Sequence, residues 1–234
     1  MGLIINIETA TQTCSVSLAK DGELLALREL NEKNIHAEVL TIFIQEVMTD
    51  AALQLTDIDA VAVSMGPGSY TGLRIGVSTA KGLCYSLDKP LIAVDSLQAM
   101  ASFASKSLKT KISDHTLFVP MIDARRMEVY TAFYKPNMEI IGKVAPHIFS
   151  EESFIEESKN HELILSGDGC AKSIDLFKER KNINIFPDIL SSSTGMISLS
   201  ERKFINKDFE DVAYFEPFYL KEFIAGIPRV KGLR

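Results

Sequence analysis

The sequence has little of what a secreted, membrane-spanning or disulfide-bonded protein needs. It contains no tryptophan, and its three cysteines, Cys14, Cys84 and Cys170, match no metal-ligand spacing and lie in apolar surroundings. They are expected to be reduced, buried thiols. The first residues, MGLIINIETA, lack the positive segment of a signal peptide, and no apolar run reaches the roughly 20 residues that cross a bilayer. We therefore expect a cytoplasmic protein without membrane contact.

Positive charge is also scarce. The chain has 25 Lys and Arg against 31 Asp and Glu, which gives a formal net charge of −6 and an isoelectric point of about 5.3. A protein that binds a polyanion by itself usually carries a basic surface. Any contact with nucleic acid is therefore expected to be local or to be made through a partner.

Familiar catalytic motifs are missing as well. The four histidines, His36, His115, His147 and His161, never stand three or four residues apart, so no helical two-histidine metal site is expected. No Gly-x-Ser-x-Gly nucleophile motif occurs. The sequence thus predicts no catalytic site and no metal site of its own, and a peptidase is the least favoured function.

What the sequence does contain is one pattern that occurs twice. Residues 3–87 read as three strands, a helix, a strand, a glycine-rich turn and a helix, with the hairpin signal Asp21-Gly22 between the second and third strands. Residues 116–186 repeat this order, with Gly167 and Gly169 in the place of Gly66 and Gly68. Mixed sheets flanked by helices suit this order. We predict an α/β protein with the duplicated, two-lobe fold of actin-like (ASKHA, ribonuclease H-like) proteins.

The predicted lobes meet in the polar stretch between residues 105 and 114. We assign residues 1–105 to an N-terminal lobe that carries a pairing surface, 106–213 to a C-terminal lobe and 214–234 to a C-terminal tail. The tail is rich in aromatic side chains and ends in basic residues. Part of it is expected to pack on the body, and its last residues to form a mobile basic end.

The densest glycine cluster, SMGPGSYTGLRIG at residues 64–76, follows an apolar run and opens a helical pattern, as phosphate-binding loops do. It fails the nucleotide motifs, because no lysine follows Gly72 and Thr71 stands where a dinucleotide fingerprint needs a glycine. Either backbone N–H groups form an anion nest, or a hydroxyl caps the helix, which we favour. The loop residues are Gly66, Gly68, Ser69 and Thr71; Ser69 or Thr71 would be the cap, as Ser96 would be for the next helix.

The helix after the loop carries small residues on one stripe, because Gly72, Gly76 and Ala80 are four residues apart. Glycine inside a helix costs about 1 kcal/mol relative to alanine, so the stripe implies that another backbone approaches closely. The helix either packs tightly on its own sheet or forms a subunit interface with the helix of residues 35–53, for which a two-fold axis is one arrangement. The residues assigned to this interface are Gly72, Leu73, Gly76, Val77, Ala80, Leu83, Phe43 and Val47.

Two carboxylates stand at the ends of corresponding predicted strands in the two halves of the chain. Glu8 and Asp123 would face a cleft between the lobes, where a pair of carboxylates can hold a magnesium–phosphate unit. A pair alone is a weak signal in a chain with 31 acidic residues. It keeps open a second hypothesis, an actin-like ATP-dependent phosphotransferase or ATPase that works in the cleft.

Four segments, taken together, resemble the bacterial TsaB (YeaZ) family: ETATQTCSVSL, GPGSYTGLRIG, IDARRMEVY and EPFYLK. The resemblance covers nearly the whole chain in order, and the glycine motif is its most specific part. Tyr70 stands where phenylalanine is common in the family. Glu8 stands where many members have aspartate, which weakens any transfer of a metal role.

The resemblance implies a non-catalytic scaffold or activator subunit for threonylcarbamoyl transfer to N6 of adenosine 37 in tRNAs that read codons beginning with A. The implied partners are a TsaD-like catalytic subunit, which binds the N-terminal lobe, and a TsaE-like ATPase at that junction. A homodimer would use much the same surface. The chain would have no cofactor of its own, with ATP and magnesium at the complex interface, and would meet tRNA mainly through the complex.

Overall fold

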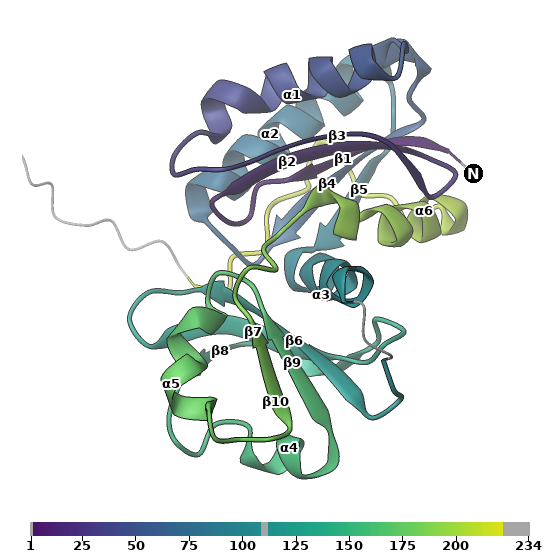
Figure 1. Ribbon diagram of the computed structural model, residues 1–234. Coiled ribbons are helices and arrows are strands. Elements are labelled where there is room, and N and C mark those ends of the chain that lie inside the picture. The colour runs from purple at the N-terminus through teal and green to yellow at the C-terminus, as the bar shows by residue number, and fades with distance from the viewer. Residues whose placement is uncertain (1, 109–111, 222–234) are drawn as a thin grey trace, which may run out of the picture.

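The computed structural model describes residues 2–108 and 112–221, which form two lobes, each built on a five-stranded mixed sheet (Figure 1). The first sheet has the order β3-β2-β1-β4-β5. Its first three strands form an antiparallel meander, and β4 and β5 join parallel to β1. Asp21 and Gly22 make the predicted hairpin turn at φ 54° and 82°. The strands are β1 (Leu3–Glu8), β2 (Thr13–Lys20), β3 (Glu23–Asn31), β4 (Ala60–Gly66) and β5 (Leu91–Asp95).

The second sheet repeats this plan in the order β10-β9-β6-β7-β8. An antiparallel meander is again extended by two parallel strands on the far side of its first strand. This repetition confirms the predicted duplicated actin-like fold. The strands are β6 (Thr116–Asp123), β7 (Glu128–Tyr134), β8 (Ile140–Ile148), β9 (Glu162–Ser166) and β10 (Ile183–Phe186).

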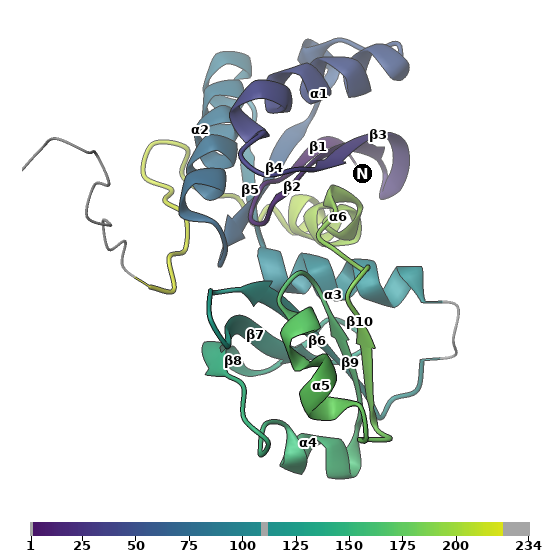
Figure 2. The same ribbon diagram turned by 60° about the vertical axis from the view of Figure 1, so that its left-hand side comes forward.

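The helices form three layers around the two sheets (Figures 1 and 2). One pair covers the outer face of the first sheet, a second pair fills the space between the sheets, and two short helices cover the far side of the second sheet. These pairs are α1 (His36–Asp50) with α2 (Tyr70–Leu87), α3 (Ser96–Ser107) with α6 (Ile197–Asn206), and α4 (Ile155–Asn160) with α5 (Ile174–Phe177).

The middle layer exchanges helices between the lobes. Helix α3 belongs to the first half of the chain but packs chiefly on β6, whereas α6 belongs to the second half and packs on β1 and β5. One buried cluster therefore contains side chains of both sheets, such as Ile4, Phe118 and Leu199. The lobe boundaries proposed from the sequence remain a prediction. The exchanged helices pack on the sheet of the other half of the chain and so extend across these boundaries.

One local feature differs from the expectations. Asp95, not Ser96, caps α3, since its Oδ1 accepts a hydrogen bond from the backbone N–H of Gln98 at 2.7 Å. The same Oδ1 accepts from the Tyr134 hydroxyl at 3.0 Å, which links the end of β5 to β7.

The double role of Asp95 leads to a stability prediction. Asp95→Ala should lower the free energy of unfolding by about 2 kcal/mol, because it removes a helix cap and leaves the buried Tyr134 hydroxyl without its acceptor. Asp95→Asn keeps an acceptor oxygen and should lose less than half as much. Urea unfolding followed by circular dichroism measures both variants. Equal losses would contradict the role of the acceptor oxygen.

Candidate functional site

The glycine loop connects β4 to α2 and lies against the end of β1. Ser69 Oγ accepts a hydrogen bond from the backbone N–H of Gly72 at 3.2 Å, and the Ser69 N–H donates to the Ala10 carbonyl oxygen at 2.6 Å. Ser69 is thus the helix cap, as predicted, while Thr71 lies inside the first turn. Anion binding by the loop remains a prediction.

The stripe of small residues faces the protein's own first sheet. A Cβ atom added at Gly72 would overlap the carbonyl oxygen of Thr9, and one added at Gly76 would overlap the Thr9 hydroxyl. The sequence correctly indicated that a backbone approaches closely, but that backbone is the segment after β1. The interface assignment is therefore corrected for the residues that are buried in this packing: Gly72, Leu73, Gly76, Val77, Ala80 and Val47.

The surface that α1 and α2 do expose lies on their outer side. Tyr85 is 86% exposed and Ile42 50% exposed, although both are large apolar side chains. Phe43 and Leu83, which the sequence also assigned to the interface, are partly buried against the core of the first lobe. The two helices lie side by side on the outer face of the first sheet (Figures 1 and 2). We call the two exposed positions, Ile42 on α1 and Tyr85 on α2, the outer helix face.

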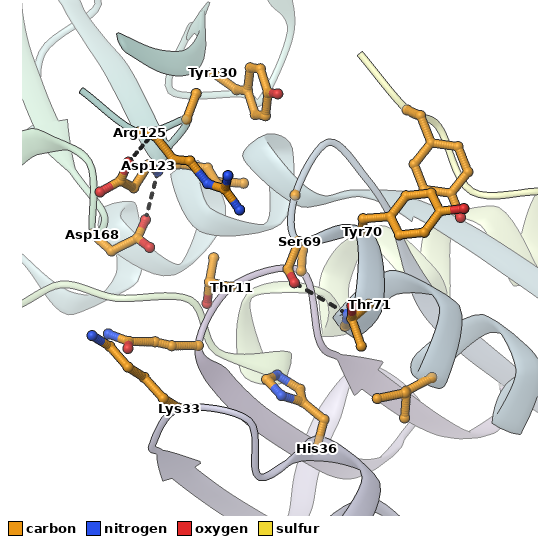
Figure 3. Close-up of a pocket in the computed structure, with 18 of the residues that line it drawn as sticks. Thr11, Lys33, His36, Ser69, Tyr70, Thr71, Asp123, Arg125, Tyr130 and Asp168 are labelled. Atoms are coloured by element: carbon orange, nitrogen blue, oxygen red, sulfur yellow. Dashed lines mark hydrogen bonds between the residues drawn. The ribbon is translucent and has the colours of Figure 1, made fainter. Parts of the chain in front are cut away.

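A cavity of about 650 Å³ lies between the lobes at the N-terminal end of α2 (Figure 3). Its first-lobe wall contains the loop after β1, the start of α1 and the glycine loop. Its second-lobe wall contains the β6–β7 turn, Tyr130 and Asp168, and the C-terminal segment closes one side. Among the side chains that line it are Thr11, Lys33, His36, Ser69, Thr71, Asp123, Arg125, Asp168 and Tyr219.

The two carboxylates of the cavity already have partners. Asp123 forms an ion pair with Lys172 at 2.6 Å and accepts a hydrogen bond from the backbone N–H of Arg125. Asp168 Oδ1 accepts from the backbone N–H of Asp123 at 3.2 Å, and burial raises the pKa of Asp168 to about 6. In the described residues no ion pair involves the side chains of Lys33 or Arg125, so these cations are available to a ligand.

Glu8 does not face this cavity. It is 1% exposed, and its Oε1 accepts a hydrogen bond from the Ala10 N–H at 2.6 Å beneath the glycine loop. Burial raises its pKa to about 7. The expected pairing of Glu8 with Asp123 is therefore wrong, because the chain turns sharply after β1 and folds the carboxylate inward. Among residues 2–108 and 112–221 no group of three His, Cys, Asp or Glu side chains could hold a metal ion.

Two parts of the cavity were not anticipated from the sequence. His36, in the first turn of α1, is 6% exposed, and its ring borders the cavity (Figure 3). The tail packs on the body up to Lys221, as expected in part: Lys81 Nζ donates to the Ala213 and Phe215 carbonyl oxygens at 3.1 and 2.9 Å. The Tyr219 ring lies 4.9 Å from the Tyr70 ring and lines the cavity. The expected basic end falls on residues 222–234, outside the described residues.

One serine–histidine pair exists on the second lobe. His147 Nε2 and Ser153 Oγ are 2.8 Å apart. Ser153 is buried, and its hydroxyl also accepts a hydrogen bond from the backbone N–H of Ser150, which is the arrangement of a polar turn. Neither residue lines the inter-lobe cavity. The geometry suits a structural role in the segment that precedes α4.

Comparison with known proteins identifies the family. A family model described as TsaD, tRNA N6-adenosine threonylcarbamoyltransferase, matches residues 26–222. The tRNA threonylcarbamoyladenosine biosynthesis protein TsaB of Escherichia coli (strain K12) is 32% identical, over 95% of this chain and 96% of that protein. The chain belongs to the TsaB family. The TsaB protein of Haemophilus influenzae is 29% identical over 93% of both chains.

A solved structure supports the fold of this TsaB-family chain. YeaZ from Pseudomonas aeruginosa superposes with a TM-score of 0.81 at 24% identity, over 94% of this chain and all of that one. At this identity the likeness establishes the architecture and leaves the chemistry to the residues themselves. No helix in the described part of the chain combines the length and apolar character that crossing a membrane requires.

The buried stripe of α2 leads to a matched pair of substitutions. Gly72→Ala should destabilise the protein by roughly 1–3 kcal/mol, because the new Cβ would overlap backbone that cannot move aside easily. Gly82→Ala on the same helix meets open space and should be neutral or stabilising by up to about 1 kcal/mol. Thermal and urea unfolding measure the difference. If Gly72→Ala were as stable as the parent, the stripe would not be packed as described.

Glu8 leads to a prediction about pH. Its pKa in the folded protein, about 7, lies above the ordinary 4.5, so the folded state holds a proton that the unfolded state has lost between these values. Its contribution to stability is therefore complete below pH 4.5 and is lost as the pH rises toward 7, by about 3 kcal/mol at most. Glu8→Gln should remove this part of the pH dependence and be more stable than the parent at pH 8. Urea titrations of both proteins from pH 5 to 8 test this, and parallel curves would contradict it.

Proposed function

We propose that this chain is a non-catalytic scaffold or activator subunit that pairs with a TsaD-like catalytic subunit. The reaction of the complex would be threonylcarbamoyl transfer to N6 of adenosine 37 in tRNAs that read codons beginning with A. The printed names of the relatives and the match to the TsaD family model support this role. The absence of any paired-histidine motif from the sequence is consistent with catalysis in the partner.

The observation that carries the pairing proposal is the outer helix face. Each of the two outer helices exposes a large apolar side chain, Ile42 on α1 and Tyr85 on α2, which a partner would cover. Tyr85, the most exposed of them at 86%, is also a residue type that often dominates binding energy. The same face would serve a homodimer when the chain is alone, and a TsaE-like ATPase would join at the junction. ATP and magnesium would bind at that junction, and tRNA would be met mainly through the complex.

The pairing proposal predicts a selective loss of binding. Tyr85→Asp and Ile42→Asp should each weaken association with the TsaD-like subunit at least tenfold, roughly, because a carboxylate would be buried in an apolar contact. Both positions are exposed, so folding should be unaffected. Ile148→Asp is the matched control, since Ile148 is 69% exposed on β8 of the other lobe.

Light-scattering chromatography of each variant, alone and mixed with the TsaD-like subunit, measures this. A homodimer of the parent that converts to a mixed complex, and that both first-lobe variants fail to form, supports the proposal. Unchanged pairing in Tyr85→Asp and Ile42→Asp would place the interface elsewhere.

A second candidate is an actin-like ATP-dependent phosphotransferase or ATPase, which the inter-lobe cavity favours. It requires ATP and magnesium to bind the isolated chain through Asp123, because Glu8 points away from the cavity. Calorimetry with ATP and magnesium on the parent and on Asp123→Ala tests it: binding that the substitution abolishes would favour this candidate.

A further inference from the structure

A second, smaller cavity lies between α2 and residues 210–219, which we call the C-terminal strap (Figure 2). We call this cavity the strap groove. Its apolar part includes the buried side chains of Val77 and Phe215. Its volume of about 200 Å³ is below the roughly 300–1,000 Å³ of pockets that hold small organic molecules. The strap groove therefore suits a single side chain of another protein better than a free ligand.

Hydrogen bonds fix the strap on the first lobe. The Glu210 N–H donates to a carbonyl oxygen of β5 at 2.9 Å, and the Phe218 N–H donates to a carbonyl oxygen of β4 at 2.7 Å. Between these two points, Lys81 Nζ holds the strap to α2 through the carbonyl oxygens of Ala213 and Phe215. A partner therefore meets a preformed surface, which lowers the cost of ordering on binding.

The strap adds a second exposed tyrosine to the outer side of α2. Tyr85 at 86% and Tyr214 at 84% are the two most exposed large apolar side chains among the described residues. Both are linked to Lys81, because Tyr85 lies one helical turn after it and Tyr214 follows Ala213, its hydrogen-bond acceptor. Tyrosine is enriched among the residues that dominate binding energy. The apolar surface that begins at Tyr85 thus continues onto the strap.

The strap groove and Tyr85 also share one face of α2. Arg74, Ser78, Lys81 and Tyr85 follow one another at intervals of four, three and four residues, which places them along a single stripe of the helix. The first three line the strap groove. The stripe is about 17 Å long, at 1.5 Å per residue. A partner segment that lies along α2 over Tyr85 would therefore reach the groove.

The charge around the strap groove favours an acidic partner. The exposed Arg74 guanidinium lies over the Tyr70 ring, 4.7 Å from its centroid, a contact that helps to hold it in place. Within the described residues Arg74 forms no ion pair, and Lys81 is bound by uncharged carbonyl oxygens. The groove wall contains one carboxylate, Glu216, against these two cations. A carboxylate of a partner would complete the pairing of Arg74.

We propose that the strap groove receives an apolar side chain of the TsaD-like subunit, with a carboxylate of the same segment bound to Arg74. The apolar side chain would pack on Val77 and Phe215. This inference rests on the pairing proposed above and extends it, because the strap comes from the end of the chain and not from the first-lobe helices. A second copy of this chain is the alternative occupant that the experiments must separate.

Calorimetric titration with the TsaD-like subunit tests the proposal. Arg74→Glu and Tyr214→Ala should each raise the Kd at least about tenfold. The matched controls are Arg202→Glu and Ile205→Ala, which change exposed residues of α6 in the same kinds of way and should leave the Kd within about twofold. Because both arginine variants change the net charge equally, equal effects of the two would overturn the contact at Arg74.

The same titrations separate this inference from the pairing proposal. Loss of binding in Tyr85→Asp and Ile42→Asp, with unchanged binding in Arg74→Glu and Tyr214→Ala, would overturn the role of the strap groove and leave the pairing proposal intact. No association of the parent protein would overturn both. Raising the salt concentration from 50 to 500 mM should weaken binding of the parent more than that of Arg74→Ala, since screening acts on the ion pair. Identical salt dependence would contradict the carboxylate contact.

Hydrogen exchange followed by mass spectrometry identifies the occupant without mutation. Addition of the TsaD-like subunit should slow exchange in residues 213–219, while the amides of β8 on the other lobe should not change. The chain alone is measured at several concentrations as the control for a second copy. Protection of residues 213–219 that grows with the concentration of the chain alone, and that the subunit does not increase, would overturn the assignment of the occupant.

Discussion

The contact between α2 and the segment after β1 is the constraint on which the rest of the first lobe depends. Gly72 and Gly76 bring the helix against Thr9, and the Ser69 N–H donates to Ala10. This contact fixes the direction of α2 over the sheet and folds Glu8 beneath the loop. It also determines which faces of α2 remain available to ligands and partners, because one side of the helix is fully buried against the sheet. The start of α2 is left at the cavity, and the opposite side of the helix is left to solvent.

The two lobes are held together by the helices that they exchange. With α3 on the second sheet and α6 on the first, apolar side chains of both sheets share one core. Buried polar contacts add to it, including the 2.6 Å hydrogen bond from Ser200 to Asn6 and that from Tyr134 to Asp95. Such a layer resists separation of the lobes, because opening would expose apolar surface and leave buried polar groups unpaired. A cavity between lobes joined in this way is largely preformed.

The sequence predicted the strands, helices and internal repeat well, but it predicted poorly what packs around individual side chains. The alternation of apolar and polar residues and the Asp21-Gly22 turn predicted the strands. The repeated order of strands and helices predicted the duplicated fold. The spacing of Gly72 and Gly76 predicted a close backbone contact, but helical periodicity defines a face without saying what covers it. Likewise, the burial of His36 at the start of α1 has no signal in the sequence, because it depends on the loop after β1 and on the glycine loop, which are distant in sequence. The inward turn of Glu8 was missed for the same reason.

The division of α2 into faces determines how function can be separated from stability. A substitution on the inner stripe disturbs the packing of α2 on the sheet, so loss of pairing in such a variant carries no information about an interface. Tyr85, Ile42 and Arg125 are exposed, and their substitution changes a surface while leaving the core intact. Along a helix of 18 residues, about 27 Å in length, the cavity and the exposed tyrosine lie near opposite ends. One rigid helix carries both the cavity and the outer helix face, so a ligand and a partner influence each other only through the packing that fixes α2. A variant that loses ligand binding but keeps partner binding, or the reverse, therefore identifies which surface was changed.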